Sequence, residues 1–68
     1  MILKWKLLDG VYHAQKQGWV FNIYVLDDGK FNLIVDYKTA EMPDYDDIFE
    51  NLSDAKNRAE NILKGSVI

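Results

Sequence analysis

His13 is the side chain best suited to proton transfer, because it is the only histidine in the chain and imidazole titrates near neutral pH. A catalytic histidine needs a nucleophile within hydrogen-bond reach and a further group that orients the ring. The sequence has no cysteine, and its serines are Ser53 and Ser66. Since Ser53 fits the start of a helix, we predict that the protein is not an enzyme and that His13 is an ordinary strand residue.

A second set of reactive groups is a run of acids without a base, from residue 41 to residue 50. Clustered carboxylates bind hard divalent cations, but the EF-hand spacing is absent, because no glycine or closing glutamate stands at the required positions. We therefore expect no metal and no cofactor. The acids can steer a basic partner onto the chain, or they can serve only solvation, turns and caps. The candidate partner-binding residues are Glu41, Asp44, Asp46, Asp47 and Glu50.

Aromatic side chains interleaved with lysines are a third pattern, typical of platforms that stack single-stranded nucleic acid. The alternation of the sequence assigns the tryptophans and phenylalanines to a core, which leaves Tyr12 and Tyr24 beside the lysines. The net charge of −3 opposes binding to phosphates. Direct nucleic-acid binding therefore ranks below protein binding.

Length and composition limit the architecture that can position these groups. A chain of 68 residues forms one domain, residues 1–68, and a domain this small buries only about 60% of its unfolded surface. With 49% hydrophobic and 28% charged residues, the composition is that of a folded globular protein. No apolar run reaches the roughly 18 residues of a membrane span, and residues 1–6 do not resemble a signal peptide, so the expected compartment is the cytoplasm.

The strongest structural signal is a hairpin around Asp27-Asp28-Gly29. Residues 19–26 and 31–37 both alternate with period two, as strands do. A two-residue turn would pair Phe21 with Asp36, whereas a three-residue turn with a left-handed Gly29 pairs Phe21 with Val35 and keeps the apolar side chains together. We predict the three-residue turn.

The remaining pattern predicts more strands and a helix. Residues 2–8 alternate before the turn Asp9-Gly10, and residues 11–16 form a shorter, more polar strand. Residues 53–65 have an apolar stripe at helical spacing, with Ser53 as the N-cap, Ala55 and Ala59 facing the sheet, and Glu60 on the exposed side. Residues 44–50 fit a helical turn, an edge strand or an open loop. The expected fold class is α+β, a small antiparallel sheet of three to four strands with one C-terminal helix on one face.

One helix covers only one face of such a sheet. The opposite face of the hairpin is half apolar, and contiguous apolar surface of this kind marks partner sites. The candidate partner or dimer face consists of Val20, Asn22, Tyr24 and Ile34.

The chain also resembles a group of short uncharacterised phage-type or bacterial proteins built from a small sheet and one helix. The resemblance rests on the aromatic hairpin with Asp-Asp-Gly at its tip and on the segments 49–56 and 58–60. It implies the sheet-plus-helix fold and a phage or mobile-element origin, and it implies no activity.

Taken together, these patterns predict a non-catalytic interaction protein whose acidic surface occupies a basic site on a host protein, as an inhibitor or a nucleic-acid mimic. The first alternative is a structural homodimer joined through the outer sheet face. The second is a single-stranded nucleic-acid binder.

Overall fold

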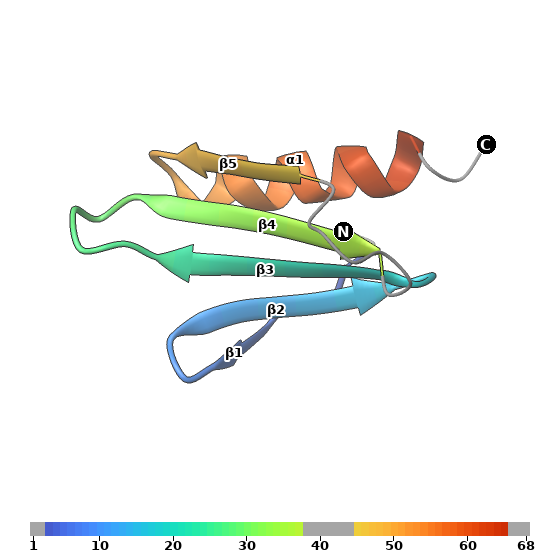
Figure 1. Ribbon diagram of the computed structural model, residues 1–68, viewed down its shortest axis with the longest axis horizontal. Helices are drawn as coiled ribbons and strands as arrows, with labels where there is room; N and C mark the ends of the chain where they lie inside the picture. The colour runs from blue at the N-terminus through green and yellow to red at the C-terminus, as the bar shows by residue number, and fades with distance from the viewer. Residues whose placement is uncertain (1–2, 38–44, 66–68) are drawn as a thin grey trace.

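The computed structural model describes residues 3–37 and 45–65, which form a five-stranded antiparallel sheet and one C-terminal helix (Figure 1). This confirms the α+β class, and the sheet has one strand more than the three or four predicted. The strands are neighbours in chain order. The elements are β1 (Lys6–Leu8), β2 (Val11–Lys16), β3 (Trp19–Val25), β4 (Phe31–Tyr37), β5 (Tyr45–Phe49) and α1 (Leu52–Gly65).

The β3–β4 hairpin has the predicted register. Phe21 pairs with Val35, and the paired strands close with a backbone hydrogen bond of 2.8 Å from Leu26 N to Lys30 O. The turn consists of the three residues between Leu26 and Lys30 and ends in Gly29. The φ of Gly29 is 84°, in the left-handed region, which costs glycine no steric strain. The predicted three-residue turn is therefore confirmed.

Two shorter turns join β1 to β2 and β2 to β3. Both of their central residues have positive φ, namely Asp9 and Gly10 in the first turn and Gln17 and Gly18 in the second. This is the type I′ geometry, whose twist matches that of the strands it connects. These turns place the shorter, polar strand β2 between β1 and β3, as a meander requires.

Strand β5 is the part of the fold that the sequence left open among three conformations. It is an edge strand, antiparallel to β4. The side-chain amide of Asn32 on β4 binds β5: its Nδ2 donates to Asp46 Oδ1 at 2.7 Å and to the Asp47 carbonyl oxygen at 2.9 Å. The backbone pairing and this amide therefore hold an acidic segment in the sheet.

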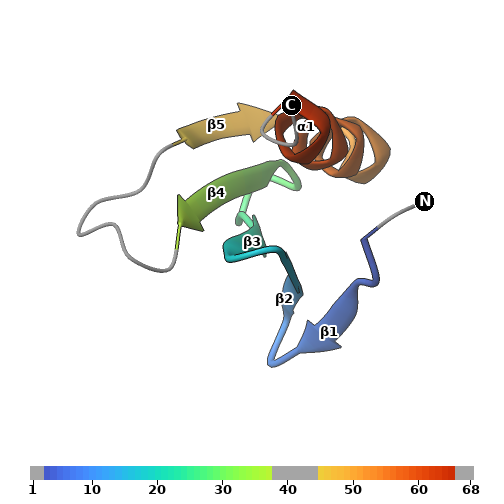
Figure 2. The same ribbon diagram turned by 90° about the vertical axis from the view of Figure 1, so that its right-hand side faces the viewer.

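Helix α1 lies on one face of the sheet, as predicted (Figure 2). Ala55 and Ala59 are fully buried against the strands, and their small side chains let the helix approach closely. The core is formed by Leu3, Ala14, Phe21, Ile23, Leu33, Val35, Ala55, Ala59 and Leu63.

Two details of the predicted helix are wrong. The helix begins at Leu52, and the Asn51 carbonyl accepts a hydrogen bond of 3.3 Å from Ala55 N, so the N-cap is Asn51 and not Ser53. Glu60, expected on the exposed side, is buried.

Trp5 of the N-terminal segment and Tyr12 of β2 lie against the side of the helix that carries Lys56, one turn before Glu60. Figure 2 shows this segment on the same side of the sheet as α1. Lys56 Nζ lies 5.9 Å from the centre of the Trp5 ring and 5.3 Å from the centre of the Tyr12 ring, within the range of cation–π attraction. Residues far apart in the sequence thus cover a helix side that the helical pattern alone assigns to solvent.

Candidate functional site

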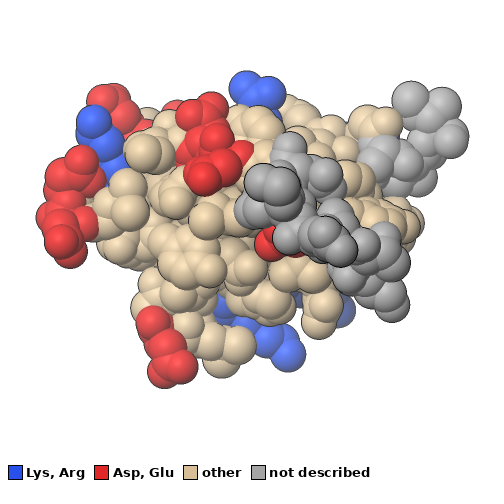
Figure 3. Space-filling model, viewed as in Figure 1, with Lys and Arg blue, Asp and Glu red and all other residues tan. Residues whose placement is uncertain are grey.

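The sheet face opposite the helix, here called the outer face, carries the predicted partner residues. The register aligns Val20, Asn22 and Tyr24 of β3 beside Asp36, Ile34 and Asn32 of β4. Val20, Asn22 and Ile34 are half-buried, and Tyr24 is 39% exposed. Figure 3 views this face, which is largely uncharged at its centre. The structure therefore brings together all four residues that the sequence proposed for a partner or dimer face.

The strand pairing extends this face into rows that cross the whole sheet. The two complete rows of described residues are Lys6–His13–Asn22–Ile34–Asp46 and Leu8–Val11–Tyr24–Asn32–Ile48. The first row runs from a lysine on β1 to an aspartate on β5, and the second begins and ends with exposed aliphatic side chains, Leu8 at 57% and Ile48 at 56%. The outer face therefore carries a lysine at one edge and an aspartate at the other, and the positions between them are half polar and half apolar.

His13 sits in the first of these rows. Its Nδ1 lies 2.7 Å from Asn22 Oδ1, so a hydrogen bond joins the two side chains. The partner is an amide on a neighbouring strand, which orients the ring without supplying a nucleophile. Tyr12, expected on this face with the lysines, pairs instead with Ile23 and packs against the core, so the predicted stacking platform loses one of its two tyrosines.

The predicted acidic cluster is divided by the structure. Glu41 and Asp44 lie outside the described residues. Asp46 stands opposite Ile34 on the outer face, whereas Asp47 stands opposite Leu33 on the helix side. Glu50 follows the end of β5 and is exposed. The three described acids therefore do not share one face.

A different acidic surface is created by the topology. In an antiparallel meander alternate connections lie at the same end, so the β1–β2 turn, the β3–β4 turn and the start of α1 are spread across one end of the sheet (Figure 1). These segments carry five exposed carboxylates and one lysine, Lys30, in a chain of net charge −3. Figure 3 shows acids gathered toward this end. The acidic end consists of Asp9, Asp27, Asp28, Glu50 and Asp54.

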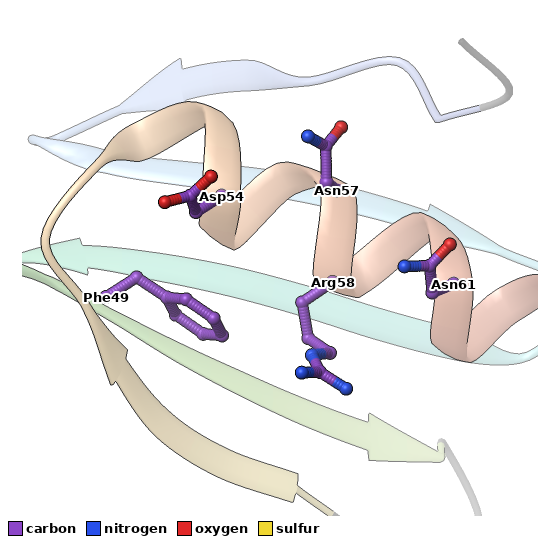
Figure 4. Close-up of a pocket in the computed structure, with 5 residues that line it drawn as sticks. All are labelled: Phe49, Asp54, Asn57, Arg58 and Asn61. Carbon is purple, nitrogen blue, oxygen red and sulfur yellow. The ribbon is translucent and has the colours of Figure 1, made fainter.

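A hollow of about 340 Å³ lies between β5 and α1, lined by Phe49, Asp54, Asn57, Arg58 and Asn61 (Figure 4). Arg58 extends from the helix toward β5, and Asn57 points away from that strand. These are binding groups without a nucleophile or a histidine. Among residues 3–37 and 45–65, no three side chains of the metal-ligating types come together to hold a metal ion.

The pKa of the Tyr45 hydroxyl is raised in the folded protein. Burial raises the pKa of Tyr45 above its usual value near 10, and the hydrogen bond of 3.1 Å that its hydroxyl donates to Asp47 Oδ2 raises it further. The carboxylate of Asp47 also repels a phenolate, and Arg58 acts in the opposite direction. The folded state therefore favours the neutral phenol.

Because the folded pKa is raised, Tyr45 stabilises the fold below about pH 10, and this contribution is lost as pH rises through the folded pKa. Between about pH 9 and about pH 11, the free energy of unfolding of the native chain should fall more than that of Tyr45→Phe. Urea unfolding at both pH values measures the difference, since the remaining tyrosines and lysines titrate in both proteins. Equal losses in the two proteins would contradict this role.

Comparisons with protein-family models, with curated proteins and with solved structures give no match to this chain. Within the described part of the chain, no helix is long and apolar enough to cross a membrane.

Proposed function

We propose that the protein is a non-catalytic interaction protein that occupies a basic site on another protein, in the manner of an inhibitor or a nucleic-acid mimic. The observation that supports this most is the acidic end, where three separate connections contribute five exposed carboxylates. Carboxylates that line one end of a sheet create a negative potential there, which attracts basic surfaces over a Debye length of about 8 Å at physiological salt. The sequence pattern suggested such a function with residues 41–50 as the binding surface, and this proposal uses the acidic end instead, with Glu50 common to both.

The acids also remain accessible to a partner where they serve the turns. Asp28 Oδ1 accepts a hydrogen bond of 3.1 Å from Lys30 N, and the side chain is exposed. Like charges placed close together oppose folding by self-repulsion. A partner with clustered lysines or arginines would relieve this repulsion on binding, and the strength of the complex would fall steeply with salt.

A pair of matched variants tests the proposal. The first replaces the four turn and loop acids of the acidic end by amides, which keeps the side-chain acceptors of the turns: Asp9→Asn, Asp27→Asn, Asp28→Asn and Glu50→Gln. The second makes the same change in the segment that the sequence singled out, except at Asp46 on the outer face: Glu41→Gln, Asp44→Asn and Asp47→Asn. The first variant removes four negative charges from the chain and the second removes three.

The measurement is displacement of a fluorescent DNA duplex from a lysine-rich DNA-binding protein, such as a linker histone, at several salt concentrations. The native chain should displace the duplex, and the first variant should need at least a tenfold higher concentration. The second variant should differ from the native chain by less than threefold. If both variants weaken displacement equally, net charge and not the acidic end is responsible, and if the native chain never displaces the duplex the proposal fails.

A further inference from the structure

The outer face is electrically self-complementary. Its β1 edge carries Lys6, and its β5 edge carries Asp46, in the same cross-strand row. The sheet itself separates these side chains, so they cannot satisfy each other within one chain. A surface with opposite charges at opposite ends of one row matches a rotated copy of itself.

We infer that two copies of this chain associate face to face through the outer face, about a two-fold axis that runs parallel to β3. Rotation about such an axis exchanges left and right across the sheet while it keeps the direction along the strands. It therefore places β1 of one protomer over β5 of its partner and β2 over β4, with the sheets about 10 Å apart, as in other packed sheet pairs. In this arrangement Lys6 meets the second copy's Asp46, and Leu8 meets its Ile48.

The axis is selected by the charges at the two edges. A two-fold axis in the same plane but perpendicular to the strands would place β1 over β1 and β5 over β5, so that both lysines would lie at one edge of the interface and both aspartates at the other. Such groups of like charges are unfavourable across an interface. The axis parallel to β3 replaces them with two equivalent pairs of opposite charge and stacks Tyr24 of one protomer near its own copy.

A hollow at the β1 edge lies where the carboxylates of the second copy would bind. Lys4, Lys6, His13, Ala14 and Gln15 line a space of about 210 Å³ beside the end of β1. Two ammonium groups and a side-chain amide, that of Gln15, are suited to carboxylates. In the proposed dimer Gln15 of β2 lies across from Asp36 of β4, because both occupy the row of Val20. Two acids of one copy, Asp36 and Asp46, are thus directed toward this edge of the other.

The area of the outer face indicates how tightly the dimer should associate. Strands about 4.8 Å apart and residues rising about 3.4 Å each outline roughly 500 Å² on a five-stranded sheet of this length. Two such faces bury about 1,000 Å², near the lower limit for a specific interface. We therefore expect a reversible dimer that dissociates on dilution, and a domain as small as this one gains most from such burial.

The dimer also affects the proposed function without depending on it. Because the axis keeps the strand direction, the acidic ends of both protomers lie at the same end of the dimer. Their like charges oppose association there, so the dimer should tighten as salt screens them, and a basic partner would meet two sets of five carboxylates. Self-association and partner binding remain separate measurements, so either can fail while the other holds.

Charge exchange tests the geometry. Sedimentation equilibrium over a dilution series should give a dimer of the 7.9 kDa chain, and Lys6→Glu or Asp46→Lys alone should raise the dissociation constant at least tenfold, which is about 1.4 kcal/mol. A mixture of these two variants should associate again, to within about threefold of the native chain, because each supplies the charge that the other now needs. The control Lys64→Glu makes the same charge change at the exposed end of the helix and should alter nothing.

Two results would overturn the inference. One is a native chain that stays monomeric up to millimolar concentration. The other is a native dimer whose two single variants do not restore association when mixed, since this would mean that Lys6 and Asp46 do not face each other. Tyr24→Asp provides an independent check. Because Tyr24 lies near the two-fold axis, the substitution places two negative charges at the centre of the interface. The variant should be monomeric by sedimentation and folded by circular dichroism.

Discussion

Phe21→Ala should unfold the chain at room temperature. Phe21 is 0% exposed at the centre of β3 and lies in an edge-to-face contact with Trp5, at 6.4 Å between ring centres. Replacing a buried phenylalanine by alanine costs about 3–5 kcal/mol. A domain of this length has a total stability of roughly 3–10 kcal/mol, so the loss is comparable to the whole.

Urea unfolding followed by tryptophan fluorescence measures this effect directly, because Trp5 reports on the same contact. Phe21→Leu keeps most of the volume and should leave a folded protein with reduced stability, which gives a graded series. Val25→Ala on the same strand is the matched control: Val25 is 51% exposed, and its substitution should cost less than about 1 kcal/mol. A Phe21→Ala protein that unfolds as late as the Val25→Ala protein would show that the core does not centre on Phe21.

The hairpin could be predicted from sequence because one constraint decided it. Residues on one face of β3 and β4 repeat with period two, and a shift by one residue would have placed Asp36 against Phe21. Only the three-residue turn avoids this clash of polarity, and the observed pairing of Phe21 with Val35 follows from it. Local alternation and turn length are both visible in the sequence.

The sequence did not decide the conformation of β5, because polar and apolar residues both occur on each face of this strand. Its residues Tyr45, Asp47 and Phe49 face the helix side, so an acid interrupts the apolar alternation, and two successive aspartates disfavour a strand by propensity. The pairing with β4 and the amide of Asn32 outweigh that propensity. Both are long-range contacts, which a local pattern does not contain.

The acidic end depends on this strand, whose conformation the sequence left open. Without β5 the helix would begin at the end of the sheet where β4 finishes, away from the β3–β4 turn. Because β5 returns the chain across the sheet, Glu50 and Asp54 join Asp27 and Asp28. The candidate surface therefore followed from the number of strands, whereas the four residues of the outer face followed from the hairpin alone and were predicted together.

Ala59→Leu should produce the second large loss of stability. Ala59 has no exposed surface and lies where α1 rests on the sheet. Leucine and alanine are both strong helix formers, so the substitution leaves the helix itself nearly unchanged and adds three carbon atoms to a filled contact. Overpacking of this kind costs about 1–3 kcal/mol, because the helix must move away from the strands or the new side chain must adopt an unfavourable rotamer.

Asn57→Leu separates packing from helix propensity. Asn57 is exposed on the same helix, so leucine there meets solvent and should change the free energy of unfolding by less than about 0.5 kcal/mol. Urea denaturation compares the two variants, and near-ultraviolet circular dichroism of the tryptophans reports whether the helix has shifted over the sheet. If Ala59→Leu and Asn57→Leu unfold at the same urea concentration, the helix does not rest on its alanines. The close approach that buries Ala55 and Ala59 would then not be what holds α1 in place.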